Sequence, residues 1–238
     1  MLAPPSHDKY FMVTFKQFLK ENGLGVDRGV GDAEHRKSIE RWFFDHLDNF
    51  KPGKLYLTDD GIDYEANMVF KRNVAESTFP FKMNSVDGDM LFLSYSSISS
   101  FENFPKTING SLQLNNAKIT SVDGIPSTIL GSVELYGNKI RTLKDIHKKL
   151  KKINGFISID ANPIRGPILG LILIEGIRSL RFPKNAMISG EFTPRNAKER
   201  LMMAFGIVNK HIKDGKAGVL AAQDELESHL KLEEFAGL

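Results

Sequence analysis

The sequence predicts an α/β protein whose centre is a short parallel-sheet solenoid, with helices at both ends. The main observation is a recurring segment: copies begin at Asp89, Gly110 and Gly131, each 21 residues after the last. A fourth copy begins at Gly155 after a small insertion, and a degenerate copy precedes them at residues 68–80. The copies also share their apolar positions, and amphipathic segments flank them. Because repeats of this length form solenoids by stacking, we expect four to five repeats.

The shared apolar positions predict one strand per repeat. Each copy carries two apolar residues around a variable one, an alternation that places both apolar side chains on one face of a strand. We expect the inward pairs to be Leu91 and Leu93, Leu112 and Leu114, Val133 and Leu135, and Ile157 and Ile159. A single repeat cannot bury so many apolar groups, whereas stacked copies form a continuous core. Ordinary hairpins are the alternative, and the constant period disfavours them.

The repeat resembles the leucine-rich repeat, L-x-L-x-x-N-x-L, at the short end of that class. The asparagine that turns the chain after the strand is present as Asn138 and Asn162, and serine and alanine replace it in the other two copies. Pro105 and Pro126 occupy equivalent positions, where a fixed φ favours an extended convex-side segment over a helix. The resemblance implies a parallel sheet on the concave side.

The chain divides into four predicted parts. These are an N-terminal helix and flexible linker (1–31), an N-terminal cap of one helix and one strand (32–65), the solenoid (66–190), and a C-terminal helical cap (191–238). Asp32 is the expected N-cap of the first cap helix, and the strand is expected around Leu55. Thr193-Pro194 is expected to start the first C-terminal helix.

The two C-terminal helices are predicted from apolar residues at helical spacing. The first is expected to bury Leu201, Met202, Phe205, Val208 and Ile212, and the second Val219, Leu220, Leu226 and Leu230. Asp214-Gly215 separates them. A terminal cap is the favoured interpretation, and a partner-binding helical hairpin is the alternative.

Composition excludes several classes of function. The chain has 238 residues, no cysteine and a formal net charge of +3, so disulfides and cysteine-ligated metals are excluded and a concentrated cationic face is not expected. The six histidines lack metal-site spacing. The apolar run at residues 168–174 is too short to cross a bilayer and is expected in the core. We therefore expect no enzyme activity, no cofactor or metal and no membrane partner, and a small-molecule substrate is disfavoured.

Beyond the repeat itself, the chain is similar to uncharacterised leucine-rich-repeat proteins of T4-like tailed bacteriophages. The similarity rests on N-G-S-L-Q-L-N-N-A-K-I-T-S-V-D-G-I-P at 109–126, N-P-I-R-G-P-I-L-G-L-I-L-I-E-G at 162–176, and I-V-N-K-H-I and A-A-Q-D-E-L at 207–212 and 221–226. It implies a viral protein in the cytoplasm of the infected host cell, and it supplies no catalytic residue.

The N-terminal segment suggests an alternative location. Residues 14–21 resemble the short segments that direct internal head proteins of such phages into the prohead, and Leu19-Lys20-Glu21 matches the L-x-E pattern after which those segments are cleaved. Asn22 departs from the best cleavage contexts, and Met12 is an alternative start. A virion component is therefore the second functional hypothesis, beside a plain amphipathic helix.

The favoured binding site follows from strand geometry. Residues that alternate with the inward pairs face outward, and we expect a host or viral protein to bind this concave face. The predicted partner-binding residues are Phe92, Ser94, Gln113, Asn115, Glu134, Tyr136, Phe156, Ser158 and Asp160. Aromatic residues in a polar field are typical of binding hot spots.

A lysine cluster in the insertion between the third and fourth copies gives a third hypothesis. Its possible anion-binding residues are Lys144, Lys148, Lys149, Lys151 and Lys152. At helical spacing they could bind nucleic acid or an acidic protein. Little aromatic interleaving accompanies them, so a solvated lysine-rich face is favoured over nucleic-acid binding.

Overall fold

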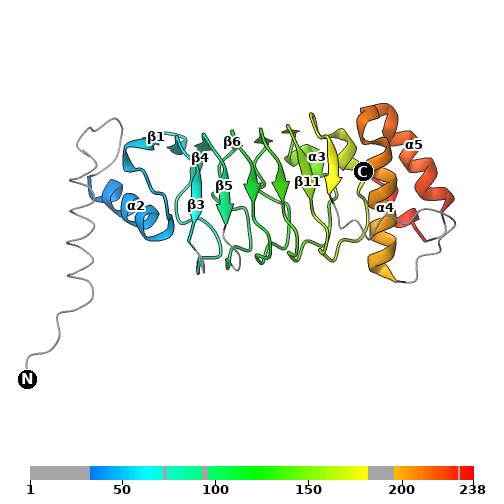
Figure 1. Ribbon diagram of the computed structural model, residues 1–238, viewed down its shortest axis with the longest axis horizontal. Coiled ribbons are helices and arrows are strands. Elements are labelled where there is room, and N and C mark those ends of the chain that lie inside the picture. Colours follow the sequence, from blue (N-terminus) through cyan, green and yellow to red (C-terminus); the bar gives the residue numbers. More distant parts are fainter. Residues whose placement is uncertain (1–32, 72–73, 93–95, 182–195, 230) are drawn as a thin grey trace, which may run out of the picture.

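In the computed structural model, which describes residues 33–71, 74–92, 96–181, 196–229 and 231–238, the chain winds into a β-solenoid. Five coils follow one another along an almost straight axis, with helix α2 at one end and helices α4 and α5 at the other (Figure 1). The predicted stacking of repeats in parallel register is therefore confirmed, including the degenerate first copy at residues 68–80.

Each of the five coils contributes one strand to each of two sheets. Strand β1 at one end and strand β12 at the other bring each sheet to six strands. Sheet A consists of β3 (Met68–Phe70), β5 (Met90–Phe92), β7 (Leu112–Gln113), β9 (Val133–Glu134), β11 (Phe156–Ser158) and β12 (Ser179–Arg181), all parallel. Sheet B consists of β1 (Leu55–Thr58), β2 (Gly61–Tyr64), β4 (Met83–Val86), β6 (Thr107–Ile108), β8 (Thr128–Ile129) and β10 (Lys152–Ile153). Only β1 runs antiparallel to its neighbour, β2.

Sheet B refines the prediction for the convex side. The segments after Pro105 and Pro126 are extended, as expected, but they also pair as strands β6 and β8 across adjacent coils. Within the repeats, the sequence alternation identified only the strands of sheet A. Because the solenoid axis is almost straight (Figure 1), the predicted concave side is better described as the outer face of sheet A.

A column of glycines forms the corner between the two sheets. Gly88, Gly110 and Gly131 each lie two residues before the first residue of a strand of sheet A, and Gly155 lies directly before one. A Cβ on Gly110 would lie 2.5 Å from the carbonyl carbon of Gly88, and one on Gly131 would lie 2.7 Å from that of Gly110. Since no side chain fits where successive turns touch, this column fixes how the coils stack.

The glycine column corrects the predicted register of the first full copy. Met90 pairs with Leu112 and Leu91 with Gln113, so Met90 and Phe92 point inward instead of Leu91, and Leu93 lies outside the described residues. The step from Met90 to Leu112 is 22 residues, not 21. Four consecutive apolar residues fit either alternation, and the turn that contains Gly88 decides between them.

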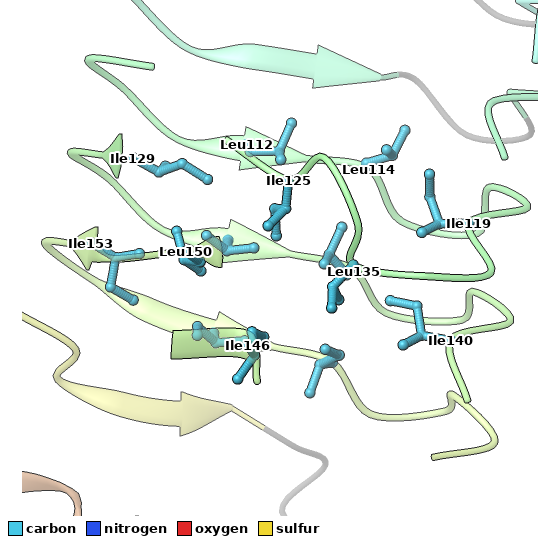
Figure 2. Packing of buried hydrophobic residues seen from close by; sticks show 14 of the residues in the cluster. Leu112, Leu114, Ile119, Ile125, Ile129, Leu135, Ile140, Ile146, Leu150 and Ile153 are labelled. Carbon is cyan, nitrogen blue, oxygen red and sulfur yellow. The ribbon is translucent and has the colours of Figure 1, made fainter. Parts of the chain in front are cut away.

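Buried asparagines link the coils next to sheet A, as the repeat pattern predicted. The Asn138 side chain donates to the carbonyl oxygens of Leu114 and Leu135, at 2.8 and 3.0 Å, and accepts from the amide of Ile119 at 3.1 Å. Asn162 makes the equivalent bonds one coil later, to Leu135, Ile159 and Ile140. Each amide therefore satisfies backbone groups of two coils beside the stacked aliphatic core (Figure 2).

The N-terminal cap closes one end of the core. Helix α2 (Ala33–His46) buries Ile39 and Phe43, and Leu47 follows it as an isolated bridge to Phe70. This bridge covers the free edge of β3, which would otherwise expose unpaired backbone groups. Trp42 is partly buried against the core, in agreement with a packing role. The predicted N-cap Asp32 lies outside the described residues.

The C-terminal helices close the other end. Helices α4 (Ala197–His211) and α5 (Gly215–Ser228) pack against the 3₁₀ segment η2 (Leu169–Leu173), whose run is buried as expected, and on the strand β12. Helix α4 begins after the N-cap Asn196, whose side chain accepts from the amide of Glu199 at 3.0 Å, and the expected start, Thr193-Pro194, lies outside the described residues. The Asn209 side chain accepts from the amide of Leu180 at 2.7 Å and so caps the edge of β12.

The predicted burial of apolar residues on these helices is confirmed for the described residues, with one exception. All five expected residues of α4 and the turn after it are buried, whereas Leu220 of α5 is 67% exposed. Val219 is partly buried and Leu226 fully buried, and Leu230 lies outside the described residues. Leu220 is exposed because α5 contacts its neighbours through a narrower face, which contains Gly218, Ala222 and Leu226.

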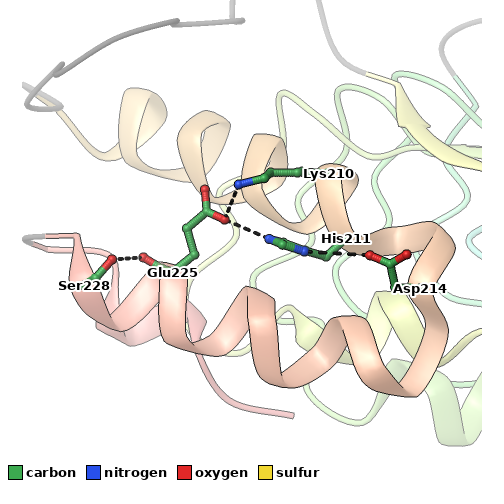
Figure 3. Close-up of polar contacts among 5 residues, drawn as sticks. All are labelled: Lys210, His211, Asp214, Glu225 and Ser228. Carbon is green, nitrogen blue, oxygen red and sulfur yellow. Dashed lines mark hydrogen bonds and ion pairs between the residues drawn. The ribbon is translucent and has the colours of Figure 1, made fainter.

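A polar cluster ties α4 to α5 (Figure 3). Glu225 accepts from Lys210 Nζ at 2.8 Å and lies 2.8 Å from His211 Nε2. Burial raises the pKa of Glu225, but the hydrogen bonds from Lys210 and His211 outweigh it and hold the pKa below its ordinary value. This carboxylate therefore stabilises the cap at neutral pH, and its contribution falls away as the pH drops through the lowered pKa.

None of the described helices is long and apolar enough to cross a membrane.

Candidate functional site

An open hollow of about 380 Å³ lies on the outer face of sheet A, where the strands end. Seven residues from four successive coils line it: Asn115, Asn116, Glu134, Tyr136, Ser158, Asp160 and Arg181. The hollow is built by stacking, because residues that are 21 to 24 positions apart in the sequence become neighbours. Five of the seven belong to the predicted partner-binding set.

Strand alternation directs these side chains outward. Leu114, Leu135 and Ile159 point into the core, so the residues beside them face the solvent side of the sheet. Tyr136 is the most exposed aromatic residue of this face, with 40% of its surface accessible. An amphipathic ring with a free hydroxyl in a polar surround suits a binding anchor.

The turn that follows each strand has a left-handed residue that shapes the rim of the hollow. Asn116, Gly137 and Ala161 occupy equivalent positions with φ of 53°, 70° and 54°. Asparagine and glycine tolerate this conformation, whereas alanine is strained in it. The Asn116 side chain consequently reaches the rim, a position that strand alternation could not predict.

Glu134 is held in place by side-chain amides from the neighbouring coil. Gln113 Nε2 donates to its Oε1 at 3.4 Å, and Asn115 Nδ2 donates to its Oε2 at 3.1 Å. Asn115 Oδ1 in turn accepts from the amide of Tyr136 at 2.9 Å. Within the described chain, no cation lies within ion-pair distance of Glu134. The carboxylate is thus oriented but not neutralised.

Asp160 is the second carboxyl group of the hollow and the most buried one, with 4% of its surface exposed. Burial raises its pKa, while the hydrogen bond from Ser158 Oγ at 3.1 Å and the more distant charge of Lys198 act in the opposite direction. It lines the hollow on the outer face, as predicted, but it is buried there and not exposed. It also has no ion pair among the described residues.

Arg181 of β12 is the only cation among the described residues that line the hollow. Its guanidinium carbon lies 3.5 Å from the centroid of the Phe156 ring, a cation–π contact that covers a predicted hot-spot aromatic. Phe156 is therefore half-buried and supports the cation instead of offering an open ring. Sequence reasoning missed Arg181 because β12 does not carry the repeat pattern.

Phe92 and Gln113, two other predicted residues, do not line this hollow. Phe92 is 7% exposed and stacks on Phe70, with ring centroids 4.1 Å apart, so its assignment as an exposed anchor is wrong. The sequence alternation was read one residue out of register, so the prediction placed Phe92 on the surface instead of in the core. Ser94 lies outside the described residues. Gln113 contacts the hollow indirectly, through Glu134.

The predicted anion-binding lysines are largely engaged within the chain. Lys148 pairs with Asp145 at 2.7 Å, Lys149 with Asp123 at 2.5 Å, and Lys152 with Glu175 at 2.7 Å. The helix that carries part of this cluster, α3, spans only Ile146–Lys149. Lys144 and Lys151 are exposed. The structure therefore does not assemble the five lysines into one free cationic strip.

The chemistry of the hollow is that of recognition by hydrogen bonds and charge. Its lining offers two oriented carboxyl groups, amide side chains, one hydroxyl-bearing ring and one stacked guanidinium. In the described ranges, no group of three or more histidine, aspartate or glutamate residues is arranged to hold a metal ion. The polar groups mostly hydrogen-bond one another.

No family model matches this chain, and the searches of curated proteins and of solved structures likewise found no match.

Proposed function

We propose that this chain is a non-enzymatic scaffold of the leucine-rich-repeat type that binds another protein on the outer face of sheet A. The observation that supports this function is the hollow around Tyr136, where an exposed aromatic ring lies beside two carboxyl groups that form no ion pair with any described residue. Exposed aromatics in a polar surround are the usual anchors of protein interfaces.

The charge of the hollow favours a basic side chain on the partner. Glu134 and Asp160 supply two carboxyl groups, and the single cation, Arg181, is stacked on Phe156. An arginine or lysine of the partner could donate to Glu134 while its stem packs on the Tyr136 ring. Hydrogen bonds to charged groups contribute about 1.5–3 kcal/mol, which is enough for an anchor contact.

The open shape of the hollow supports binding over catalysis. A catalytic site generally excludes water and holds an activated nucleophile or base near a bound substrate. Here Glu134 is solvated on an open face, and its two oxygens already accept bonds from Gln113 and Asn115. Asp160 is bonded to Ser158 in the same way.

The biological setting of the proposal comes from the phage resemblance. A host or viral protein in the cytoplasm of an infected cell is the proposed partner. The alternative of a virion component depends on residues 14–21, which lie outside the described residues, and it stays a prediction. Loss of the first 21 residues from protein recovered from particles would support it.

Site-specific photo-crosslinking tests the proposed function. We would replace Tyr136 with benzoylphenylalanine in the full chain, expressed in infected cells, and identify any crosslinked protein by mass spectrometry. The control carries the same probe at Leu220, which is exposed on α5, away from sheet A. We expect a protein that is captured from position 136 and not from position 220.

The affinity of the purified partner for variants of the hollow then tests whether the hollow is the binding site. We expect Glu134→Gln and Tyr136→Ala to weaken binding by about tenfold or more, while Leu220→Ser leaves it unchanged. Equal capture from positions 136 and 220, or unchanged affinity for both hollow variants, would place the interface elsewhere and contradict the proposal.

A further inference from the structure

Four exposed cations form a patch that no local sequence cluster reveals. Lys118, Lys139, Arg141 and Arg165 come from three successive coils, and all four are exposed. They lie on the segment that follows the turn after sheet A, one step around the coil from the hollow. We call this patch the basic ridge.

Backbone pairing places the four residues together. The amide of Lys139 donates to the carbonyl of Ile119, next to Lys118, and the amide of Arg165 donates to the carbonyl of Arg141, at 2.8 Å each. Ile119 and Ile140 point into the core (Figure 2), so the residues on either side of them point outward. Neighbouring coils are about 4.8 Å apart, and alternate residues are about 6.6 Å apart along the chain.

The basic ridge differs from the lysine cluster in its partners. Within the part of the chain that the structure describes, none of its four cations forms an ion pair, whereas three of the five clustered lysines do. The single polar contact of a ridge side chain there is Lys118 Nζ with Ser97 Oγ at 3.3 Å. Like charges that folding brings together lower the stability of the folded chain unless an anion compensates them. A basic ridge without ion pairs therefore points to an anion supplied by a binding partner.

We propose that the basic ridge binds an acidic segment of a protein. The ridge spans three coils, about 10 Å, which matches three to four residues of an extended chain at about 3.3 Å each. Segments 117–122, 138–143 and 162–166 contain no aromatic residue that could stack on bases, which disfavours single-stranded nucleic acid. This surface is separate from the hollow, and its test does not depend on the function proposed for the hollow.

Binding of a labelled acidic peptide tests the proposal. The probe is a fluorescein-labelled decapeptide of alternating glutamate and serine, titrated with the full chain in about 0.15 M salt, where charges beyond about 8 Å are screened. The ridge variant carries Lys139→Gln, Arg141→Gln and Arg165→Gln. The matched control removes three paired lysines, through Lys148→Gln, Lys149→Gln and Lys152→Gln, and so changes the net charge equally.

The expected result is a peptide affinity that falls about tenfold in the ridge variant and less than twofold in the control. Equal loss in both variants would mean a response to net charge alone, and absence of binding even at about 0.05 M salt would overturn the proposal outright. Tighter binding of a ten-nucleotide oligothymidine through the same three residues would reassign the ridge to nucleic acid. Unfolding midpoints confirm that all variants remain folded.

Discussion

The two halves of the solenoid are packed with different side chains. In the first coils, aromatic rings fill the core: Phe43, Phe50 and Tyr64 stack on one another, and Phe70 stacks on Phe92. Between Ile108 and Leu180, every buried hydrophobic side chain is aliphatic. The asparagine bonds between coils, made by Asn138 and Asn162, also belong to the second half.

This difference explains why the candidate site lies where it does. Small aliphatic side chains fill successive coils of the second half, and the outer residues of its strands lie in columns although the step from coil to coil varies from 21 to 24 residues. In the first half, the aromatic residue Phe92 is part of the core. Aromatic packing therefore fills the core of one half, while the proposed binding surface lies on the other half.

The largest expected effect separates a buried from an exposed aromatic. Phe92→Ala should lower the free energy of unfolding by about 3–5 kcal/mol, because it opens a cavity among stacked rings. Tyr136→Ala should lower it by about 0.5 kcal/mol or less, since that ring is exposed. Urea unfolding followed by far-ultraviolet circular dichroism measures both. Similar losses for the two variants would restore the register in which Phe92 faces outward.

The next largest effect is the stability cost of removing the inter-coil side chain, which we compare at equivalent positions of the two halves. Asn138→Ala should cost about 2–3 kcal/mol, because it leaves buried backbone groups of two coils without partners. At the equivalent position of the first half, the buried Ser96 Oγ has no hydrogen-bond partner among the described residues. Ser96→Ala should therefore be nearly neutral. A cost at Ser96 as large as that at Asn138 would mean that both halves rely on the same inter-coil bonds.

Most of the second half was predictable from the sequence, and less of the first half was. Where only the inward residues of a strand are apolar, as in Leu112 to Leu114, the alternation fixes the register. Where four consecutive apolar residues begin at Met90, the alternation does not fix the register. There, the glycine at position 88 is the feature of the sequence that indicates it. Strands β6, β8 and β10 of sheet B were not predicted, because each contains a single apolar residue and therefore shows no alternation.

The hollow was predictable in part for the same reason. Columns of outward residues gave Asn115, Glu134, Tyr136, Ser158 and Asp160 from the repeat alone. Asn116 reaches the hollow because of a left-handed turn, and Arg181 belongs to a strand outside the repeat pattern. Their positions in the lining are therefore visible only in the folded chain. Two ion pairs of the lysine cluster could not be predicted, because the partners Asp123 and Glu175 lie in other coils.

A smaller effect concerns the left-handed turn in the second half. Ala161 has a φ of 54°, a conformation that costs about 1 kcal/mol for a residue with a Cβ. Ala161→Gly should therefore raise the free energy of unfolding by about 1 kcal/mol. The control is Ala117→Gly, which removes the same methyl group where φ is negative and should be destabilising. A loss at both positions would show that Ala161 is not strained.

The smallest effect is the pH dependence that Asp160 contributes. Since burial raises its pKa, its protonated form is favoured in the folded chain, and its ionised form costs stability at neutral pH. Asp160→Asn should therefore be slightly more stable than the wild type at pH 7, and the difference should shrink toward the ordinary aspartate pKa. Unfolding in urea at pH 7 and pH 4.5 measures it. A difference that grows on acidification would contradict the assigned cause.

Binding of the photo-crosslinked partner to Tyr136→Ala, measured beside the unfolding energy of the same variant, tests the central claim most directly. A docking surface in the regular half predicts that affinity falls by about tenfold or more while the free energy of unfolding changes by about 0.5 kcal/mol or less. Unchanged affinity in a folded variant would show that the hollow on sheet A is not the binding site.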